Sequence, residues 1–209
     1  KIFLLDEHLD RMKQTADYFL FCFERQKTKS YIKKVISRID KNDYRFRISL
    51  EKNGNLTHTF SEMFQSFNEV KVIVSKNKIY TKNRFQYFKT TNRSLYNQEY
   101  NKYTSKGFFD VIYFNEKGEL TEGAITNIFI YKNNVISTPP INAGLLPGVY
   151  RKHLLKNDSG IRERRLYLED LLEADKIVLT NSVRGEVIVN KLFLDENEFI
   201  KFNKNIQFG

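Results

Sequence analysis

The first part of the chain carries hydrophobic residues at helical spacing and then at the spacing of strands. Leu9, Met12 and Ala16 lie three or four positions apart, as on one face of an amphipathic helix. Farther on, apolar and polar residues alternate, and the pair Asn53-Gly54 predicts a tight turn between two strands. The elements predicted here are two helices and three strands, over Asp6–Leu20, Arg25–Ile39, Tyr44–Glu51, Leu56–Phe60 and Val70–Val74.

The second part of the chain combines short helical patterns with strongly apolar strands. Gly107 comes directly after a helical pattern, where a glycine commonly ends a helix. Polar residues fill Ser75–Arg84, which predicts a linker between two lobes. The elements predicted after it are helices over Asn92–Ser105, Gly148–Lys156 and Glu169–Ala174 and strands over Asp110–Asn115, Thr126–Lys132 and Ile177–Thr180. We therefore expect an α/β (α+β) protein with a small α/β domain over residues 1–82 and a larger domain over residues 83–209.

The composition is that of a folded protein without disulfide bonds. Of the 209 residues 41% are hydrophobic and 14% aromatic, which is enough apolar surface for a core. The single cysteine, Cys22, excludes an internal disulfide and fits a reducing compartment, so we expect a cytoplasmic protein. Its neighbours Phe21 and Phe23 predict a buried thiol. No apolar run reaches the roughly 20 residues that cross a bilayer, and we expect no membrane partner.

The net charge of +10 raises the question of nucleic-acid binding. The basic residues are dense from Arg25 to Arg47 and from Lys71 to Arg93, but there they alternate with apolar residues at helix and strand periods. Such spacing is typical of a solvated face. We therefore expect no nucleic-acid partner and assign to the charge a milder effect, the attraction of small anions such as phosphates and carboxylates.

Lys89 and Glu122 are the ionisable residues whose positions are compatible with catalysis. Lys89 follows the aromatic residues Phe85, Tyr87 and Phe88. Apolar surroundings would lower the pKa of its amine and favour Schiff-base chemistry. On composition alone, a lysine at such a place is more often an ordinary surface residue. Glu122 directly precedes a predicted strand, where a single glutamate is usually solvated. Neither residue identifies a function by itself.

Two polar segments have the geometry of ligand sites. Gly148, at the start of a predicted helix, would let the backbone N–H groups of Val149 and Tyr150 face an anion. Asn181 and Ser182 follow an apolar strand, where polar side chains often line a site. Most such helix starts bind nothing, however, and Asn181 and Ser182 could equally serve only to end the strand.

Taken together, these residues fall in an ordered set of motifs that resembles the signature of the class IV aminotransferases. The central part of the match comprises Glu122-Gly-Ala124-Ile-Thr-Asn127-Ile128-Phe129, Ile136-Ser-Thr138 and Leu146-Pro-Gly148-Val149-Tyr-Arg151. Three further segments are similar to the family's helix-start, lysine and phosphate-side motifs: Glu7-His8-Leu9-Asp10-Arg11, Lys89-Thr-Thr-Asn-Arg93 and Thr180-Asn181-Ser182-Val-Arg184-Gly185. The resemblance extends over essentially the whole chain, in order.

The resemblance implies a two-lobed fold type IV pyridoxal-phosphate enzyme, similar to D-amino-acid aminotransferase. Members of this family usually carry a further strand segment ahead of the His-x-Asp-Arg helix, and this chain, which begins at Lys1 rather than at a methionine, lacks it. We therefore expect an N-terminally shortened enzyme that uses pyridoxal 5′-phosphate, binds no metal and forms a homodimer.

The roles of individual residues follow from the resemblance, motif by motif. Lys89 is implied to be the Schiff-base lysine and to move protons, and Glu122 to pair with the protonated pyridine nitrogen. The phosphate is implied to be held by a charge-assisted contact from Arg11 and by the amides at the helix start. The residues implied to bind the cofactor are Arg11, Lys89, Glu122, Asn127, Val149, Tyr150, Asn181 and Ser182.

Among the subfamilies, the aminodeoxychorismate lyases resemble this chain most, as in the form fused behind a chorismate-aminating synthase. The segments that carry this resemblance are Lys89–Arg93, Leu145–Val149 and Asn181–Gly185. They imply a lyase that takes a small anionic amino substrate, 4-amino-4-deoxychorismate, to 4-aminobenzoate and pyruvate in folate biosynthesis. A branched-chain or D-amino-acid aminotransferase stays open, because the missing strand would carry a residue implicated in the lyase chemistry. A non-catalytic binding or assembly domain is the alternative of another class, and it would not need Lys89, Glu122 and Arg11 together.

Overall fold

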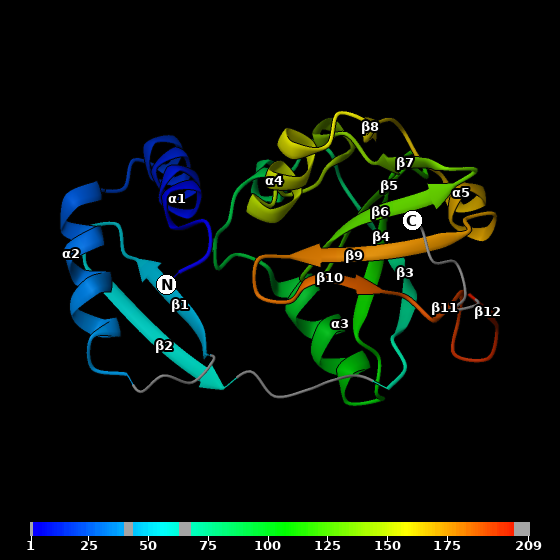
Figure 1. The fold of residues 1–209 in the computed structure, drawn as a ribbon, viewed down its shortest axis with the longest axis horizontal. Helices are drawn as coiled ribbons and strands as arrows, with labels where there is room; N and C mark the ends of the chain where they lie inside the picture. The colour runs from blue at the N-terminus through cyan, green and yellow to red at the C-terminus, as the bar shows by residue number, and fades with distance from the viewer. Residues whose placement is uncertain (1, 40–43, 63–67, 203–209) are drawn as a thin grey trace. The chain divides into compact units, whose positions relative to one another are not determined.

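The computed structural model describes residues 2–39, 44–62 and 68–202, and the chain divides into two compact units, Lys1–Ser66 and Phe67–Gly209 (Figure 1). Each unit combines helices with strands, which confirms the expected mixture of α and β elements. Within the described residues, no helix has both the length and the hydrophobicity to cross a bilayer.

The described residues of the first unit form two helices and one hairpin. Its elements are α1 (Leu5–Phe19), α2 (Arg25–Ile36), β1 (Tyr44–Leu50) and β2 (Leu56–Glu62). The two strands pair in antiparallel register, and the hydroxyl of Tyr31 lies 2.7 Å from Nδ1 of His58, which joins α2 to β2. Leu9, Ala16 and Ile32 are buried on the inner faces of the helices, as their spacing predicts.

Cys22, on the connection between α1 and α2, is exposed, so the prediction of a buried thiol is wrong. Residues along this connection alternate between half-buried and exposed, and Phe21 and Phe23 therefore turn inward while the cysteine between them turns outward. The backbone of Cys22 contacts the hairpin instead, since its N–H donates to the carbonyl of Lys52 at 3.0 Å.

The described part of the second unit, residues 68–202, contains two five-stranded sheets. The first has the order β12-β11-β3-β4-β5, with β3 (Lys71–Ile79), β4 (Asp110–Asn115), β5 (Leu120–Gly123), β11 (Lys191–Phe193) and β12 (Phe199–Lys201). The second has the order β10-β9-β6-β7-β8, with β6 (Asn127–Lys132), β7 (Val135–Thr138), β8 (Arg162–Glu163), β9 (Lys176–Asn181) and β10 (Gly185–Ile188). The helical elements are η1 (Arg84–Tyr87), α3 (Ser94–Thr104), η2 (Ile141–Ala143), α4 (Val149–Asn157) and α5 (Leu168–Leu172).

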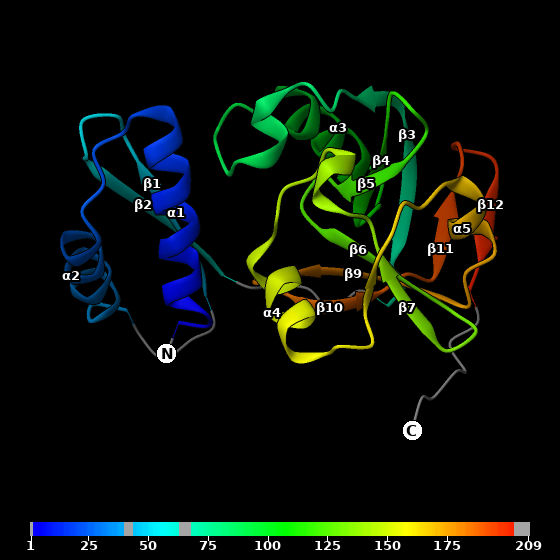
Figure 2. The same cartoon turned by 90° about the horizontal axis from the view of Figure 1, so that it is seen from above.

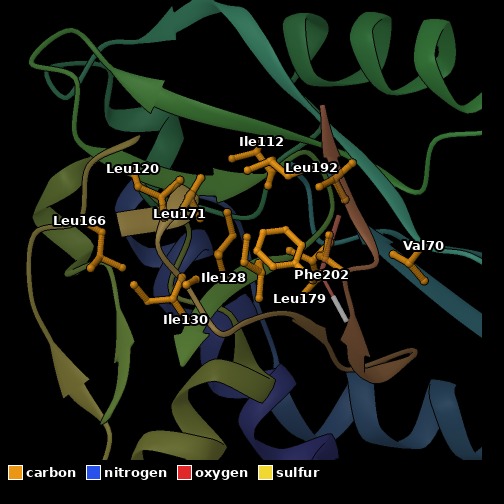
Figure 3. Packing of buried hydrophobic residues seen from close by; sticks show 14 of the residues in the cluster. Val70, Ile112, Leu120, Ile128, Ile130, Leu166, Leu171, Leu179, Leu192 and Phe202 are labelled. Atoms are coloured by element: carbon orange, nitrogen blue, oxygen red, sulfur yellow. The ribbon is translucent and has the colours of Figure 1, made fainter. Parts of the chain in front are cut away.

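A hydrophobic core fills the space between the two sheets. Ile112 and Leu120 from the first sheet belong to the same buried cluster as Ile128 and Leu179 from the second (Figure 3). A second cluster, which includes Tyr96 of α3, takes the alternate residues of β4, and Figure 2 shows α3 on the opposite side of β4 from β6 and β9. Both faces of β4 are therefore covered, which explains its nearly continuous apolar sequence.

The strand β3 begins close to the predicted place but continues to Ile79, into the segment expected as a linker. It pairs in parallel with β4 and β11, so the second unit begins well ahead of residue 83. The polar side chains of Ser75–Ile79 led to the prediction of a linker in place of the second half of this strand. The buried hydroxyl of Ser75 donates to Glu99 of α3 at 2.7 Å, and the amide of Asn77 donates to the same carboxylate at 3.0 Å. Glu99 of the neighbouring helix α3 thus supplies the hydrogen-bond acceptors for the polar side chains that made this segment resemble a linker.

Candidate functional site

The turn between β5 and β6 is the place where the chain passes from the first sheet of the second unit to the second sheet. Glu122 lies at the end of β5, and Asn127 begins β6. Asp110 of β4 holds the turn between them. Its carboxylate accepts the N–H of Ile125 at 3.3 Å and the hydroxyl of Thr126 at 2.6 Å. Asp110 is fully buried, and burial raises its pKa to about 6.

Gly123, in the same turn, has no room for a side chain. A Cβ atom built on it would lie 2.3 Å from a carboxylate oxygen of Asp110 and 2.4 Å from the hydroxyl oxygen of Thr126. The hydrogen bond between these two groups keeps both of them in place. The turn therefore closes only around a glycine, and this fixes the position of the preceding residue, Glu122.

Glu122 is a buried carboxylate with defined partners on both oxygens. Only 3% of its surface is exposed. Oε2 accepts the N–H of Leu146 at 3.1 Å, and Oε1 lies 3.2 Å from the hydroxyl of Tyr96. Burial raises the pKa of Glu122 to about 7, although the charge of Arg93, the Leu146 amide and the charge of Lys89 each lower it. The site therefore contains a carboxyl group that can gain or lose a proton near neutral pH.

The backbone of Leu146 is held from both sides by predicted site residues. Its N–H donates to Glu122, and its carbonyl accepts the side-chain amide of Asn127 at 2.9 Å. A Cβ atom on Gly148 would lie 2.0 Å from Oδ1 of Asn127, so this side chain also packs directly against the glycine that precedes α4. The structure thus brings Glu122, Asn127 and the start of α4 together.

The start of α4 also lies beside the turn that follows β9. Gly148 is the N-cap residue and supplies no side chain to cap the helix that Val149 and Tyr150 begin. The hydroxyl of Tyr150 is 3.7 Å from where a Cβ of Gly185 would be, at the end of this turn. Asn181 connects the turn to the β5–β6 corner by donating to the carbonyl of Ile125 at 3.3 Å.

Ser182 follows Asn181 in this turn and is half-buried. Oδ1 of Asn181 accepts the N–H groups of Val183 and Arg184 at 3.0 and 2.9 Å, which fixes the backbone around the serine. The predicted phosphate-side residues Val149, Tyr150, Asn181 and Ser182 therefore gather at neighbouring turns of the second unit.

Lys89 lies just beyond η1, on a segment that is anchored to the sheet. The hydroxyl of Tyr87 donates to the carbonyl of Thr81 at 2.8 Å, and the N–H of Thr81 donates to Glu116 at 3.0 Å. Lys89 itself is exposed, whereas Tyr87 is half-buried, so the expected apolar surroundings of the amine are not found. Its charge is nonetheless close enough to Glu122 to lower the pKa of that carboxyl.

Arg11 belongs to α1 of the first unit, where it is half-buried in the middle of the helix. The remaining predicted site residues belong to the second unit. The part of Arg11 in phosphate binding stays a prediction.

Asp110, Arg93 and Tyr96 belong to the site but were not predicted from the sequence. Asp110 is a single carboxylate in a strand of apolar residues, and this signal could have revealed it, because a buried carboxylate needs hydrogen-bond partners. Arg93 stands in the lysine motif, and Tyr96 follows it at the spacing of one helix face. Neither position alone shows that both side chains turn toward Glu122.

Named proteins resemble the chain over different lengths. A protein of Schizosaccharomyces pombe named "Putative aminodeoxychorismate lyase" is 29% identical over 192 residues, which cover 88% of this chain and 82% of that protein. Branched-chain-amino-acid aminotransferase 5 of Arabidopsis thaliana, a chloroplastic protein, is 39% identical over 84 residues, which cover 37% of this chain and 20% of that protein. The crystal structure of a "Putative amino-acid aminotransferase" from Mesorhizobium loti matches with a TM-score of 0.81 and 28% identity, over 90% of each chain.

The family model described as amino-transferase class IV matches residues 1–192. This range contains all the predicted site residues, from Arg11 to Ser182. Such a match covers most of the chain and agrees with the structural similarity. The chain therefore belongs to the class IV aminotransferases, a family of enzymes that depend on pyridoxal 5′-phosphate.

Proposed function

We propose that this protein is a lyase that converts 4-amino-4-deoxychorismate into 4-aminobenzoate and pyruvate. The observation that favours a lyase over a branched-chain aminotransferase is the length of the sequence match. The relative named "Putative aminodeoxychorismate lyase" matches 88% of the chain, whereas the branched-chain aminotransferase of Arabidopsis matches 37%. The net charge of +10 supports a substrate with two carboxylates. As the resemblance implies, we propose a homodimer in the cytoplasm.

The residues of the site fit pyridoxal 5′-phosphate, which combines a basic ring nitrogen with a phosphate. Burial holds the pKa of Glu122 near neutrality, and a protonated ring nitrogen beside it would supply the opposite charge that favours the carboxylate. The first turn of α4 has no side-chain cap, and N–H groups at a helix start bind phosphate well. When bound, the cofactor supplies an electron sink for the electron pair released at the carbon that bears the substrate amine.

Glu122 and Lys89 divide the chemistry between them. The ionised Glu122 would accept a hydrogen bond from the ring nitrogen and would keep a proton on it, because an opposite charge in a buried site favours the protonated form. Lys89 would hold the cofactor through its amine and would be the base that takes the proton from the substrate carbon that bears the amine. Loss of this proton would accompany cleavage of the carbon–oxygen bond to the enolpyruvyl group. Lys89 would then pass the proton to the leaving group to give pyruvate, and the remaining ring would become aromatic.

Two further groups of residues hold the cofactor in register. Asn127 and Asn181 would support the site indirectly. Their side-chain amides donate to the backbone carbonyls of Leu146 and Ile125 and so keep the neighbouring turns in place. The residues that we assign to the phosphate are Arg11, Val149, Tyr150 and Ser182.

The test is to incubate the protein and cofactor with 4-amino-4-deoxychorismate and to measure 4-aminobenzoate and pyruvate. We expect both products in equal amounts, without any keto-acid acceptor. Lys89→Ala should form neither, and Lys82→Gln, which removes an exposed cation of the same segment, should behave as the wild type. Absence of both products from the wild-type protein would contradict the lyase.

A branched-chain or D-amino-acid aminotransferase is the second candidate, favoured by the 39% identity to the Arabidopsis enzyme over 84 residues. It is tested with branched-chain and D-amino acids and 2-oxoglutarate. Glutamate formation without 4-aminobenzoate would replace the lyase by a transaminase. Neither activity, with the cofactor bound, would indicate a non-catalytic member of the family.

A further inference from the structure

Arg93 and Tyr96, at the start of α3, reach the surroundings of Glu122 from one side. Arg93 is the N-cap residue of this helix, and its guanidinium donates to the carbonyl of Ala124, two residues beyond Glu122, at 2.7 Å. The guanidinium carbon lies 4.3 Å from the centre of the Tyr96 ring, and the hydroxyl of Tyr96 lies 3.2 Å from Glu122. Arg93 is thus fixed at two points, the β5–β6 turn and the ring that contacts the carboxylate.

We propose that Arg93 and Tyr96 are positioning residues that hold Glu122 in its charged form, so that a proton shared between this carboxyl group and a ring nitrogen stays on the nitrogen. The second half of this proposal rests on the role proposed above for Glu122. The first half concerns the carboxyl group alone and needs no cofactor.

The groups that face Glu122 differ in how they respond to pH. Burial drives its pKa up to about 7, and the opposing groups are the charges of Arg93 and Lys89, the Leu146 amide and the Tyr96 hydroxyl. Lys89 must lose its charge to act as a base, so it no longer lowers the pKa of Glu122 once catalysis begins. An arginine keeps its charge at every working pH. Arg93 is therefore the lasting source of positive charge at this carboxylate.

The hydroxyl of Tyr96 has two acceptors and one proton. It lies 2.8 Å from the side-chain oxygen of Gln86 and 3.2 Å from Glu122. When Glu122 is ionised, Tyr96 donates to it, and the Gln86 amide rotates by half a turn to donate an N–H to Tyr96. When Glu122 is protonated, it donates to Tyr96, and Tyr96 donates to the Gln86 oxygen. Because Gln86 can take either role, the Tyr96 proton is available to the carboxylate whenever Glu122 is ionised.

Tyr96 keeps its own proton throughout this exchange. The side chain is 4% exposed, and burial, followed by the nearby charge of Glu122, raises the pKa of Tyr96 far above its ordinary value. The phenol therefore acts as a hydrogen-bond donor and never as a competing anion beside Glu122.

The experiment is a carbon-13 NMR titration of the Glu122 carboxyl in cofactor-free protein, with the signal assigned from Glu122→Gln. We expect Arg93→Gln to raise the midpoint by about one pH unit or more, the usual effect of losing a nearby opposite charge. Tyr96→Phe should raise it by less, and Arg93→Lys should lie close to the wild type because the charge is kept. Lys82→Gln, which removes an exposed cation of the preceding segment, is the matched control and should not move it.

An unchanged midpoint in Arg93→Gln would overturn the inference. If that variant folds poorly, Tyr96→Phe carries the test, since it removes one oxygen and an unchanged midpoint there would also overturn it. In cofactor-loaded protein we expect the pH at which the absorbance of bound pyridoxal 5′-phosphate changes to shift with the midpoint. Loss of turnover in Glu122→Gln together with an unmoved midpoint in Arg93→Gln would contradict this inference and leave the proposed function standing. A moved midpoint together with full turnover in Glu122→Gln would instead contradict the role proposed for Glu122. A moved midpoint in a protein that forms neither 4-aminobenzoate nor pyruvate would contradict the proposed function.

Discussion

Replacing Glu122 with glutamine should stabilise the cofactor-free protein at higher pH. Burial raises the pKa of Glu122 to about 7, from an ordinary value of 4.5. Between these two values the folded protein keeps a proton that the unfolded chain has lost, so the free energy of unfolding falls as the pH rises through this window. Glutamine cannot ionise, so the free energy of unfolding of the variant does not fall in this pH window.

The size of the effect follows from the two pKa values. Each pH unit between them corresponds to about 1.4 kcal/mol, so the loss in the wild-type protein approaches an order of 3 kcal/mol by pH 7 to 8. At acid pH both side chains are uncharged and similar in shape, and the two proteins should differ little. The advantage of Glu122→Gln should therefore grow between pH 4.5 and about 7 and level off above that.

Urea unfolding of the cofactor-free protein at several pH values measures this difference. The second unit is best followed by hydrogen exchange of the β4 and β6 amides, because the two units need not unfold together. Glu198→Gln changes an exposed carboxylate and should follow the wild type. Parallel curves for the wild type and Glu122→Gln would refute the reasoning, because they would mean that the carboxyl group carries no cost of burial.

The same substitution should damage function while it helps stability. Without the carboxylate, the ring nitrogen loses its counter-charge, and we expect turnover to fall by about 100-fold or more, roughly 3 kcal/mol in the barrier. Cofactor affinity should stay within about tenfold, because the phosphate contacts are separate. An unchanged rate and absorbance spectrum would show that Glu122 has only a structural role.

Three further substitutions test the other parts of the site. Lys89→Ala should still bind the cofactor but lose turnover, and borohydride treatment of the wild type should attach the cofactor to Lys89 in a peptide map; an adduct on another lysine would remove this assignment. Arg11→Ala should weaken cofactor binding by about 1.5–3 kcal/mol, the scale of a hydrogen bond to a charged group, and an unchanged dissociation constant would leave Arg11 with a structural role only. Gly148→Ala should destabilise the protein by about 1–3 kcal/mol in urea unfolding, because the added carbon would lie 2.0 Å from Oδ1 of Asn127. Gly160→Ala, at an exposed turn, is its control, and equal stabilities would show that Asn127 can move aside.

Local periodicity was sufficient to predict elements whose faces differ in polarity or that are apolar throughout. The strand over Asp110–Asn115 was predicted with the bounds that the structure has, because both of its faces are covered by core residues. The second half of β3 was missed for the opposite reason. Its polar residues Ser75 and Asn77 find their partner in Glu99, and no local pattern reveals a partner that a distant helix supplies.

The candidate site was likewise predicted only in part from the sequence. The motifs predicted Glu122, Asn127 and Gly148 as site residues, since each occupies a defined place in an ordered signature, and the structure brings these three residues together. The contacts that hold Glu122 could not be read from the sequence. The Leu146 peptide, Arg93 and Tyr96 meet this carboxylate only after two sheets and a helix have packed, and the exposure of Lys89 is likewise a property of the folded chain.

The β5–β6 corner, the turn between β5 and β6 that Asp110 holds, limits which insertions this protein can accept during evolution. An inserted residue between Glu122 and Asn127 would have to displace a strand of one sheet or the other, and it would leave a buried carboxylate without its donors. Enzymes commonly acquire new substrates by lengthening loops near the reacting atoms, and that route is closed at this corner. Descendants that stay active should keep the corner at constant length and vary their substrate range through segments elsewhere in the chain.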